Sequence, residues 1–350
     1  MLKKVFCYLL IVNCYFCIGT ADASLLEYER GDLNLKLTGE GMLGGAAARD
    51  PDDNFIYDFR IRAAANYQLT ETWKLGAVYS YDELTRSRDK LARDAFVFIE
   101  GAKGRLELGQ TSSISSKLGL GLPDVGALRL NDYSIVYEIA NPGVPLISNP
   151  IAGGSRYALR ANIVSAPTNP VQVGASFAPK SDRFNAVYDI GLRYRKPEGK
   201  TKTSMSFGVK YIDAPDGLIT DHFAPRLTAD WRAALISGLN VQYNSWQFGA
   251  NAQGIYDRNP IGIATDGLRF GAGASYDLLK FSASVSYIFS DTGIWEHADT
   301  IDIGSQTAHT GVVSLRYKIN EYFDIWTSGG LTATDSNAFP FISAGVRGKF

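Results

Sequence analysis

The amino-acid sequence predicts an all-β protein, a transmembrane antiparallel up-and-down β-barrel of about 16 strands. Apolar and polar residues alternate in segment after segment, as they do in strands that have one apolar face. The links between these segments are short at one end and long at the other. No long apolar stretch follows residue 23, so the sequence does not favour a protein that spans a membrane with helices.

The alternation is clearest in residues 55–69. The opposite sides of this segment differ in polarity, and Asp58, Arg60 and Arg62 lie on the polar side. The apolar side carries Phe55, Tyr57, Phe59, Ile61, Ala63, Ala65, Tyr67 and Leu69. The same pattern recurs at 33–43, 73–81, 184–195, 203–211, 246–256, 268–276 and 281–289. Because aromatic residues lie toward the ends of several apolar faces, as in interfacial girdles, the repetition favours a membrane barrel over a soluble sandwich.

The connecting segments differ in length in a regular way. Short polar links are expected at 69–72, 197–200, 244–245, 277–279 and 320–321. Longer links are expected at 44–53, 83–90, 212–223, 257–266, 290–306 and 333–338. Short turns on one side and long loops on the other are typical of outer-membrane barrels.

The N-terminus has the features of a secretory signal peptide. Lys3 and Lys4 precede an apolar run from Val5 to Ile18, and Ala21-Asp22-Ala23 gives a small-residue cleavage pattern. We therefore predict a signal peptide at 1–23 and a single barrel domain at 24–350. All three cysteines lie in the predicted signal peptide, which excludes disulfides and thiolate metal sites in the exported chain.

Composition and motifs argue against several other functions. The formal net charge of −1 does not suit a nucleic-acid-binding protein. Gly39–Gly44 matches a dinucleotide-binding pattern, but an alternating strand and a polar loop surround it instead of a strand and a helix. The three histidines, His222, His297 and His309, belong to no recognisable catalytic or metal-binding cluster. We predict no enzyme activity, no cofactor and no bound metal.

Two neighbouring segments carry a family resemblance. Residues 93–110 read Arg-Asp-Ala-Phe-Val-Phe-Ile-Glu-Gly-Ala-Lys-Gly-Arg-Leu-Glu-Leu-Gly-Gln, and a long segment follows at 111–154. It contains Leu122-Pro123-Asp124-Val125-Gly126 and leads to Ser155-Arg156-Tyr157. These stretches resemble the strand 4 to strand 5 hairpin, the constriction loop and the start of strand 6 of Gram-negative general porins.

The resemblance implies a trimer of 16-stranded barrels in the outer membrane, each with loop 3 (111–154) folded into its own lumen. It also implies that the C-terminal strand, which ends on Phe350, serves as an assembly signal for the barrel-assembly machinery. Ile342, Ala344 and Val346 have the alternation of that strand. Phe339 and Phe341 have the opposite parity, so we expect a bulge at the start of the strand.

A channel of this kind would pass small hydrophilic solutes and ions by passive diffusion, with loop 3 setting the size limit and lining charges setting selectivity. Strand parity and motif position place the following residues at the constriction or lumen: Lys36, Arg60, Arg62, Arg93, Asp124, Asp132, Glu138, Arg156 and Arg160. Ordinary solvated lumen charges are an alternative interpretation of Arg60 and Arg62. A solute-selective channel and a plugged structural or adhesin barrel also remain open, and besides solutes the expected partners are membrane lipid and identical subunits.

Overall fold

A computed structural model of the chain describes residues 26–48, 55–84, 92–126, 159–180, 186–196, 199–213, 231–258, 264–292, 306–334 and 338–349. The predicted signal peptide and Phe350 lie outside these ranges. The strands are β1 (Leu26–Arg30), β2 (Leu33–Ala48), β3 (Phe55–Gln68), β4 (Lys74–Leu84), β5 (Ala92–Gly101), β6 (Gly104–Gln110), β7 (Leu159–Ser165), β8 (Val171–Ala178), β9 (Ala186–Lys196), β10 (Thr201–Asp213), β11 (Trp231–Tyr243), β12 (Trp246–Arg258), β13 (Ala264–Leu278), β14 (Phe281–Thr292), β15 (Gln306–Lys318), β16 (Phe323–Thr334) and β17 (Ala338–Lys349). A short helix, α2 (Ile114–Leu118), follows β6. Among the described helices, none is long and apolar enough to cross a membrane.

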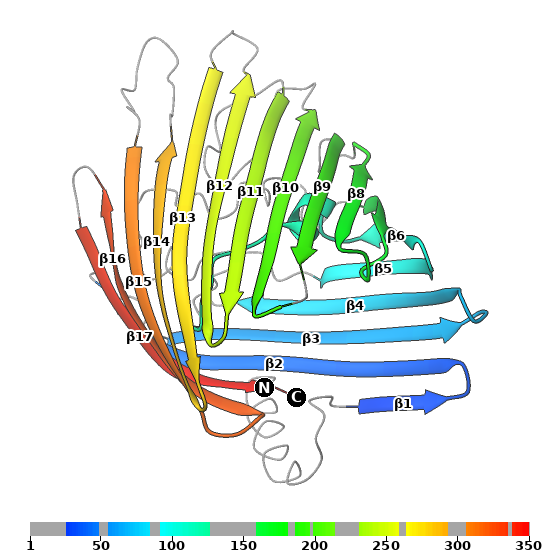
Figure 1. The fold of residues 1–350 in the computed structure, drawn as a ribbon, viewed down its shortest axis with the longest axis horizontal. Coiled ribbons are helices and arrows are strands. Elements are labelled where there is room, and N and C mark those ends of the chain that lie inside the picture. The colour runs from blue at the N-terminus through cyan, green and yellow to red at the C-terminus, as the bar shows by residue number, and fades with distance from the viewer. Residues whose placement is uncertain are drawn as a thin grey trace.

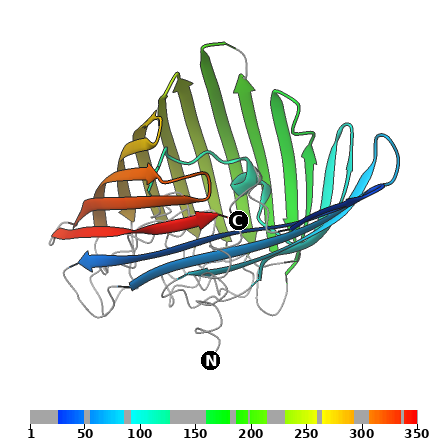
Figure 2. The same ribbon diagram turned by 90° about the horizontal axis from the view of Figure 1, so that it is seen from below.

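Sixteen strands, β2 to β17, close into an antiparallel barrel (Figures 1 and 2). Each strand pairs with the next one along the chain, and β17 pairs with β2 to complete the ring, with Ile342 opposite Ala47. The predicted fold class is therefore confirmed. The ring satisfies the backbone hydrogen bonds of every strand without leaving a long open edge, which is the condition for crossing lipid with strands.

The first short strand, β1, was not predicted. It pairs with the beginning of β2, with Leu26 opposite Leu37 and Arg30 opposite Leu33. The last strand pairs with the later part of β2, from Glu40 to Ala48. Since β3 occupies the other edge of β2, β1 and β17 share one edge, and β1 covers the part that β17 does not reach.

The two faces of the barrel wall have opposite polarity. Along β9, Tyr188 and Ile190 are exposed on the outer face, and Ile190 reaches 65% exposure. Between them, Asp189 is buried on the inner face. The same alternation runs through β10, where Phe207 is exposed and Lys210 is buried. An apolar outside and a polar inside are the reverse of a soluble barrel and suit a wall that contacts lipid.

Aromatic rows follow both rims of the outer face. At the rim with the longer links, ring centroids of neighbouring residues lie 5.1–6.3 Å apart in the series Phe177, Tyr188, Tyr211, Trp231 and Tyr256. At the opposite rim, Trp246 packs on Tyr276 at 4.7 Å, and Phe281 packs on Tyr317 at 4.8 Å. The predicted girdles are present, because these strands begin and end on aromatic residues of outer-face parity.

Most strand links alternate in length around the ring as predicted, but the links at 259–263 and 335–337, which were expected to be long, are no longer than the longest of the short turns. Two-residue turns join β5 to β6, β11 to β12 and β13 to β14. Asn244 and Leu279 adopt positive φ angles of 52° and 51° in the latter two turns. The largest boundary error is in β2, which continues through Ala48, where a loop from residue 44 was expected, because Gly44 to Ala48 find backbone partners on β17. The dinucleotide-like Gly39–Gly44 motif thus lies entirely within a barrel strand.

The expected bulge in the last strand is absent. The register of β17 against β16 is continuous from Ala338 to Gly348. Phe341 points inward and is 5% exposed. Its ring occupies the space beside Gly330, where a Cβ atom would lie 2.5 Å from the ring. The bulky inward residue therefore fits a regular strand because its neighbour on β16 has no side chain.

Candidate functional site

After β6 the chain turns into the barrel instead of crossing the rim. Thr111–Gly126, which we call the inner segment, runs along the inner wall past strands β7 to β16 (Figure 2). It begins with α2, which packs against β8, β9 and β10. The described part of predicted loop 3 thus lies inside the barrel, whereas residues 127–154 of that loop lie outside the described ranges.

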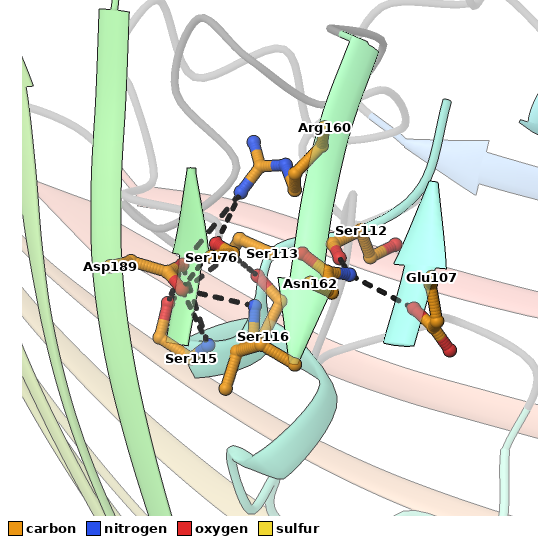
Figure 3. A network of polar contacts seen from close by, with 10 residues as sticks. Glu107, Ser112, Ser113, Ser115, Ser116, Arg160, Asn162, Ser176 and Asp189 are labelled. Carbon is orange, nitrogen blue, oxygen red and sulfur yellow. Dashed lines mark hydrogen bonds and ion pairs between the residues drawn. The ribbon is translucent and has the colours of Figure 1, made fainter. Parts of the chain in front are cut away.

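Strand β9 holds the beginning of α2 through Asp189 (Figure 3). The Asp189 carboxylate accepts hydrogen bonds from the Ile114 backbone N–H at 3.1 Å and from the Ser115 hydroxyl at 2.7 Å. It also accepts one from the Ser176 hydroxyl at 2.6 Å. The first N–H groups of a helix have no partner within the helix, so a carboxylate supplied by the wall satisfies them.

The same strand holds the end of α2 through Arg193. Its guanidinium donates to the carbonyl oxygens of Lys117, Leu118 and Gly119 at 2.7–2.8 Å. These are carbonyls that a helix end leaves without internal partners, and a cation is favourable there. One barrel strand therefore binds both ends of the helix, with an acid at one end and a base at the other.

Replacing Arg193 by glutamine should lower the free energy of unfolding by about 2–3 kcal/mol. The reason is that the carbonyl oxygens at the end of α2 lose the hydrogen bonds that the charged guanidinium donates to them. Urea unfolding of the protein refolded into detergent measures this effect. Arg195→Gln is the matched control, since Arg195 is an exposed residue of the same strand, and its expected cost is within about 0.5 kcal/mol. Equal costs for the two variants would contradict the assigned contact.

Beyond α2, the inner segment is bonded to hydroxyl groups of the wall. The Leu120 backbone N–H donates to Ser206 at 3.1 Å, and the Val125 N–H donates to Ser284 at 3.1 Å. Ser286 donates to the Pro123 carbonyl oxygen at 3.2 Å. Serine is short enough to let the segment approach the strands while it satisfies buried backbone groups.

The aspartate that binds the beginning of α2 also forms a buried ion pair within the wall. Arg160 on β7 lies 3.9 Å from the Asp189 carboxylate, and it donates to Ser176 at 3.1 Å. The two charged side chains are 1% and 0% exposed. Arg160 therefore has the inner-face parity that was predicted, but it contributes to the support of α2 and not to an open lining surface.

A second ionic contact joins α2 to the wall. Lys117 forms an ion pair with Glu107 on β6, and Asn162 donates to the same carboxylate at 3.0 Å. Asn162 also donates to the Ser112 carbonyl oxygen at 3.0 Å, as Figure 3 shows. Burial lowers the pKa of the Lys117 ammonium, and the negative charge of Glu107 opposes this shift without cancelling it.

Basic side chains on strand β3, away from α2, are more exposed than those near the helix. Arg62 on β3 is exposed, and its positive charge repels that of Arg105 on β6. The Arg105 guanidinium lies 3.5 Å from the ring centroid of Phe98 and 3.1 Å from Glu107. Stacking and the ion pair fix Arg105 in place despite the repulsion from Arg62. Arg60, near the middle of β3, is 37% exposed and lies 3.2 Å from Asp58.

The other predicted site residues are placed as follows. Lys36 lies at the short-turn rim, 3.4 Å from Glu27 of β1. The Asp124 carboxylate accepts from the Gly126 N–H at 2.9 Å and from Ser284 at 3.5 Å, so it contributes to the turn of the inner segment. Arg93 belongs to β5. Asp132, Glu138 and Arg156 lie outside the described residues, as do His222 and His297.

The structure brings together residues that the sequence analysis did not select. Asp189 and Arg193 lie in the alternating segment 184–195, but nothing in the sequence connects them to a helix more than seventy residues earlier. Glu107, Arg105 and Lys117 were also missed. Three further inner-face cations, Lys210, Arg232 and Arg269, are buried in the wall. His309 lies on the outer face, 2.6 Å from the hydroxyl of Tyr287.

Comparison with known proteins gives the family. A family model described as Gram-negative porin matches residues 27–321. This chain is a Gram-negative porin. The porin is accordingly an outer-membrane protein. No curated protein matches the porin in sequence.

Solved structures resemble the porin in fold at low sequence identity. OmpT of Vibrio cholerae, folded in vitro and described as a trimer form, has a TM-score of 0.66 at 12% identity and covers 91% of the porin and 100% of its own chain. The anion-selective porin of Comamonas acidovorans has a TM-score of 0.63 at 12% identity, with 91% and 100% covered. OmpF of Salmonella typhi has a TM-score of 0.61 at 12% identity, with 93% and 100% covered.

Proposed function

We propose that this porin forms a water-filled channel through which small hydrophilic solutes and ions diffuse passively. The observation that carries the proposal is the position of the inner segment, which lies inside a closed barrel and is bonded to its wall. A barrel of sixteen strands is wide enough to enclose an aqueous passage. A segment attached inside it reduces the cross-section and so limits the size of solute.

Selectivity by charge is the second part of the proposal. The exposed Arg62 and the partly exposed Arg60 lie near the middle of β3, where they would interact with ions in transit. A row of fixed charges beside a narrow passage favours counter-ions and repels co-ions. Arg93, Asp124, Asp132, Glu138 and Arg156 remain further proposed lining residues.

The cellular setting follows from the same proposal. Residues 1–23 direct export, and the C-terminal strand with Phe350 is recognised during barrel assembly. The short turns face the periplasm and the long links face outward, as in other outer-membrane barrels. The channel is a homotrimer without enzymatic activity. The trimer form of the structurally similar OmpT of Vibrio cholerae supports the oligomeric part of this proposal.

Planar-bilayer recording tests the proposed function. Purified, refolded porin should produce stepwise conductance increases of open-channel size, and no single sugar should saturate the passage at millimolar concentration. Saturation of the current block by one sugar would instead indicate a solute-selective channel. Absence of conductance from protein that has the far-ultraviolet spectrum of a β-barrel would refute the channel and leave a plugged structural barrel.

A further inference from the structure

Several glycines of the inner wall lie directly beneath the inner segment. Three of them belong to adjacent strands, Gly191 to β9, Gly208 to β10 and Gly238 to β11. A Cβ atom at Gly208 would lie 2.8 Å from the Cβ of Ser115. At Gly238 it would lie 2.8 Å from the Cβ of Leu120, and at Gly191 it would lie 3.0 Å from the carbonyl oxygen of Ile114. The segment therefore contacts the strand backbones as closely as atoms permit.

Two glycines on the outer face of the same barrel, in the middle parts of their strands, have no such contacts. A Cβ atom at Gly254 of β12 or Gly311 of β15 would have nothing within 4 Å. The close approach at Gly191, Gly208 and Gly238 is thus a property of the place where the inner segment lies. Glycine in a strand often marks a site where another backbone comes near, and here that backbone is the inner segment.

Strand β9 binds both ends of α2 and so holds the inner segment against these glycines. Asp189 binds the beginning of α2 and Arg193 binds its end, with hydrogen bonds of 2.7–3.1 Å on the shortest contacts. A helix held at both ends cannot tilt away at one end alone. An added side chain below α2 would therefore displace the whole helix toward the centre of the barrel.

We propose that Gly191, Gly208 and Gly238 are positioning residues that set the depth of the inner segment against the wall and, through it, the cross-section open to solutes. The proposal rests on the proposed function, in which this segment narrows a channel. It adds that the width of the passage depends on glycines of the wall, which leave room for the segment, as well as on the residues of the loop itself. Solute size limits would change with substitutions that touch no lining charge.

Single-channel recording of Gly208→Ala tests the proposal. The added methyl group should push α2 inward and lower the single-channel conductance about 1.2- to 2-fold, because the narrowest section dominates the resistance. Gly311→Ala places the same group on the outer face, where nothing lies within 4 Å, and should leave the conductance unchanged. An unaltered conductance in Gly208→Ala, measured beside a conducting wild type, would overturn the inference.

A compensating pair separates displacement of the segment from distortion of the strand. Ser115→Gly removes the Cβ that the new methyl group would meet, while the backbone N–H groups of α2 keep their hydrogen bonds to Asp189. The double variant Ser115→Gly with Gly208→Ala should regain the conductance of Ser115→Gly alone. A double variant that stays as low as Gly208→Ala would overturn the inference, because the methyl group would then act through β10.

The outcomes also distinguish this inference from the proposed function. A wild-type porin without conductance refutes the channel itself, whereas a conducting wild type whose variants are all alike refutes only the positioning by glycine. If Gly208→Ala does not assemble, its folding should be rescued by Ser115→Gly, since the clash is removed. Failure of the double variant to assemble, with Ser115→Gly alone folded, would also count against the inference.

Discussion

Replacing Asp189 by alanine is expected to lower the free energy of unfolding by about 3–5 kcal/mol, the cost of removing one member of a buried ion pair. The carboxylate is fully covered, and the Arg160 guanidinium at 3.9 Å is 1% exposed. The substitution also removes the acceptor for Ser176, for Ser115 and for the beginning of α2. Each of these donors would remain buried without that acceptor.

The measurement is equilibrium urea unfolding of the porin inserted in lipid vesicles, followed by tryptophan fluorescence. Asp277→Ala is the matched control, because Asp277 also faces an arginine, Arg316 at 3.4 Å, but is 60% exposed. An exposed pair of this kind contributes about 0–1 kcal/mol. Similar losses in the two variants would contradict the buried network as the attachment of the inner segment.

Replacing both Arg60 and Arg62 by glutamate should shift the reversal potential toward the equilibrium potential of the cation. Both side chains lie near the middle of β3 and are accessible enough to act on ions in the passage. A tenfold ratio of the concentrations of a singly charged ion on the two sides of the membrane corresponds to an equilibrium potential of about 59 mV. We expect a shift on the order of 10 mV in a tenfold potassium chloride gradient, because fixed charge at a narrow section changes the ratio of ion permeabilities.

The control reverses two cations away from the middle of the barrel. Arg195 and Lys202 are exposed and lie on β9 and β10 near the short-turn rim, so Arg195→Glu with Lys202→Glu carries the same change in charge. Its shift should be clearly smaller, since the passage is wider and more strongly screened there. Equal shifts would assign Arg60 and Arg62 to the ordinary solvated lining and not to the constriction.

The fold was predictable because its signal is local. A strand shows its two faces within ten residues, and the repetition of that period at regular intervals predicts the barrel without knowledge of any long-range contact. Ile190 and Phe207 are exposed and Asp189 is buried as the period requires. The errors arose where a distant partner decides the local structure, as for the regular strand at Phe341, which depends on Gly330.

The site was predictable only in part for the same reason. Parity placed Arg60, Arg62 and Arg160 on the inner face, and the long segment after β6 was expected inside the barrel. Parity does not tell which inner residues the segment will cover. Arg160 is buried beside Asp189, which binds α2, whereas Arg62 stays exposed. Contacts between segments far apart in the chain have no signature within either segment alone.

The shared edge of β2 has a consequence for aggregation. Its partner β17 follows all the strands from β3 to β16 in the chain, so that pairing joins segments far apart in sequence. A strand with a free edge invites pairing with other chains. The hairpin of β1 with β2 joins two segments that are adjacent in the chain, and it shields the part of the edge from Leu33 to Leu37. The short N-terminal strand thus covers the part of the β2 edge that β17 does not reach, which would otherwise stay open to pairing with other chains.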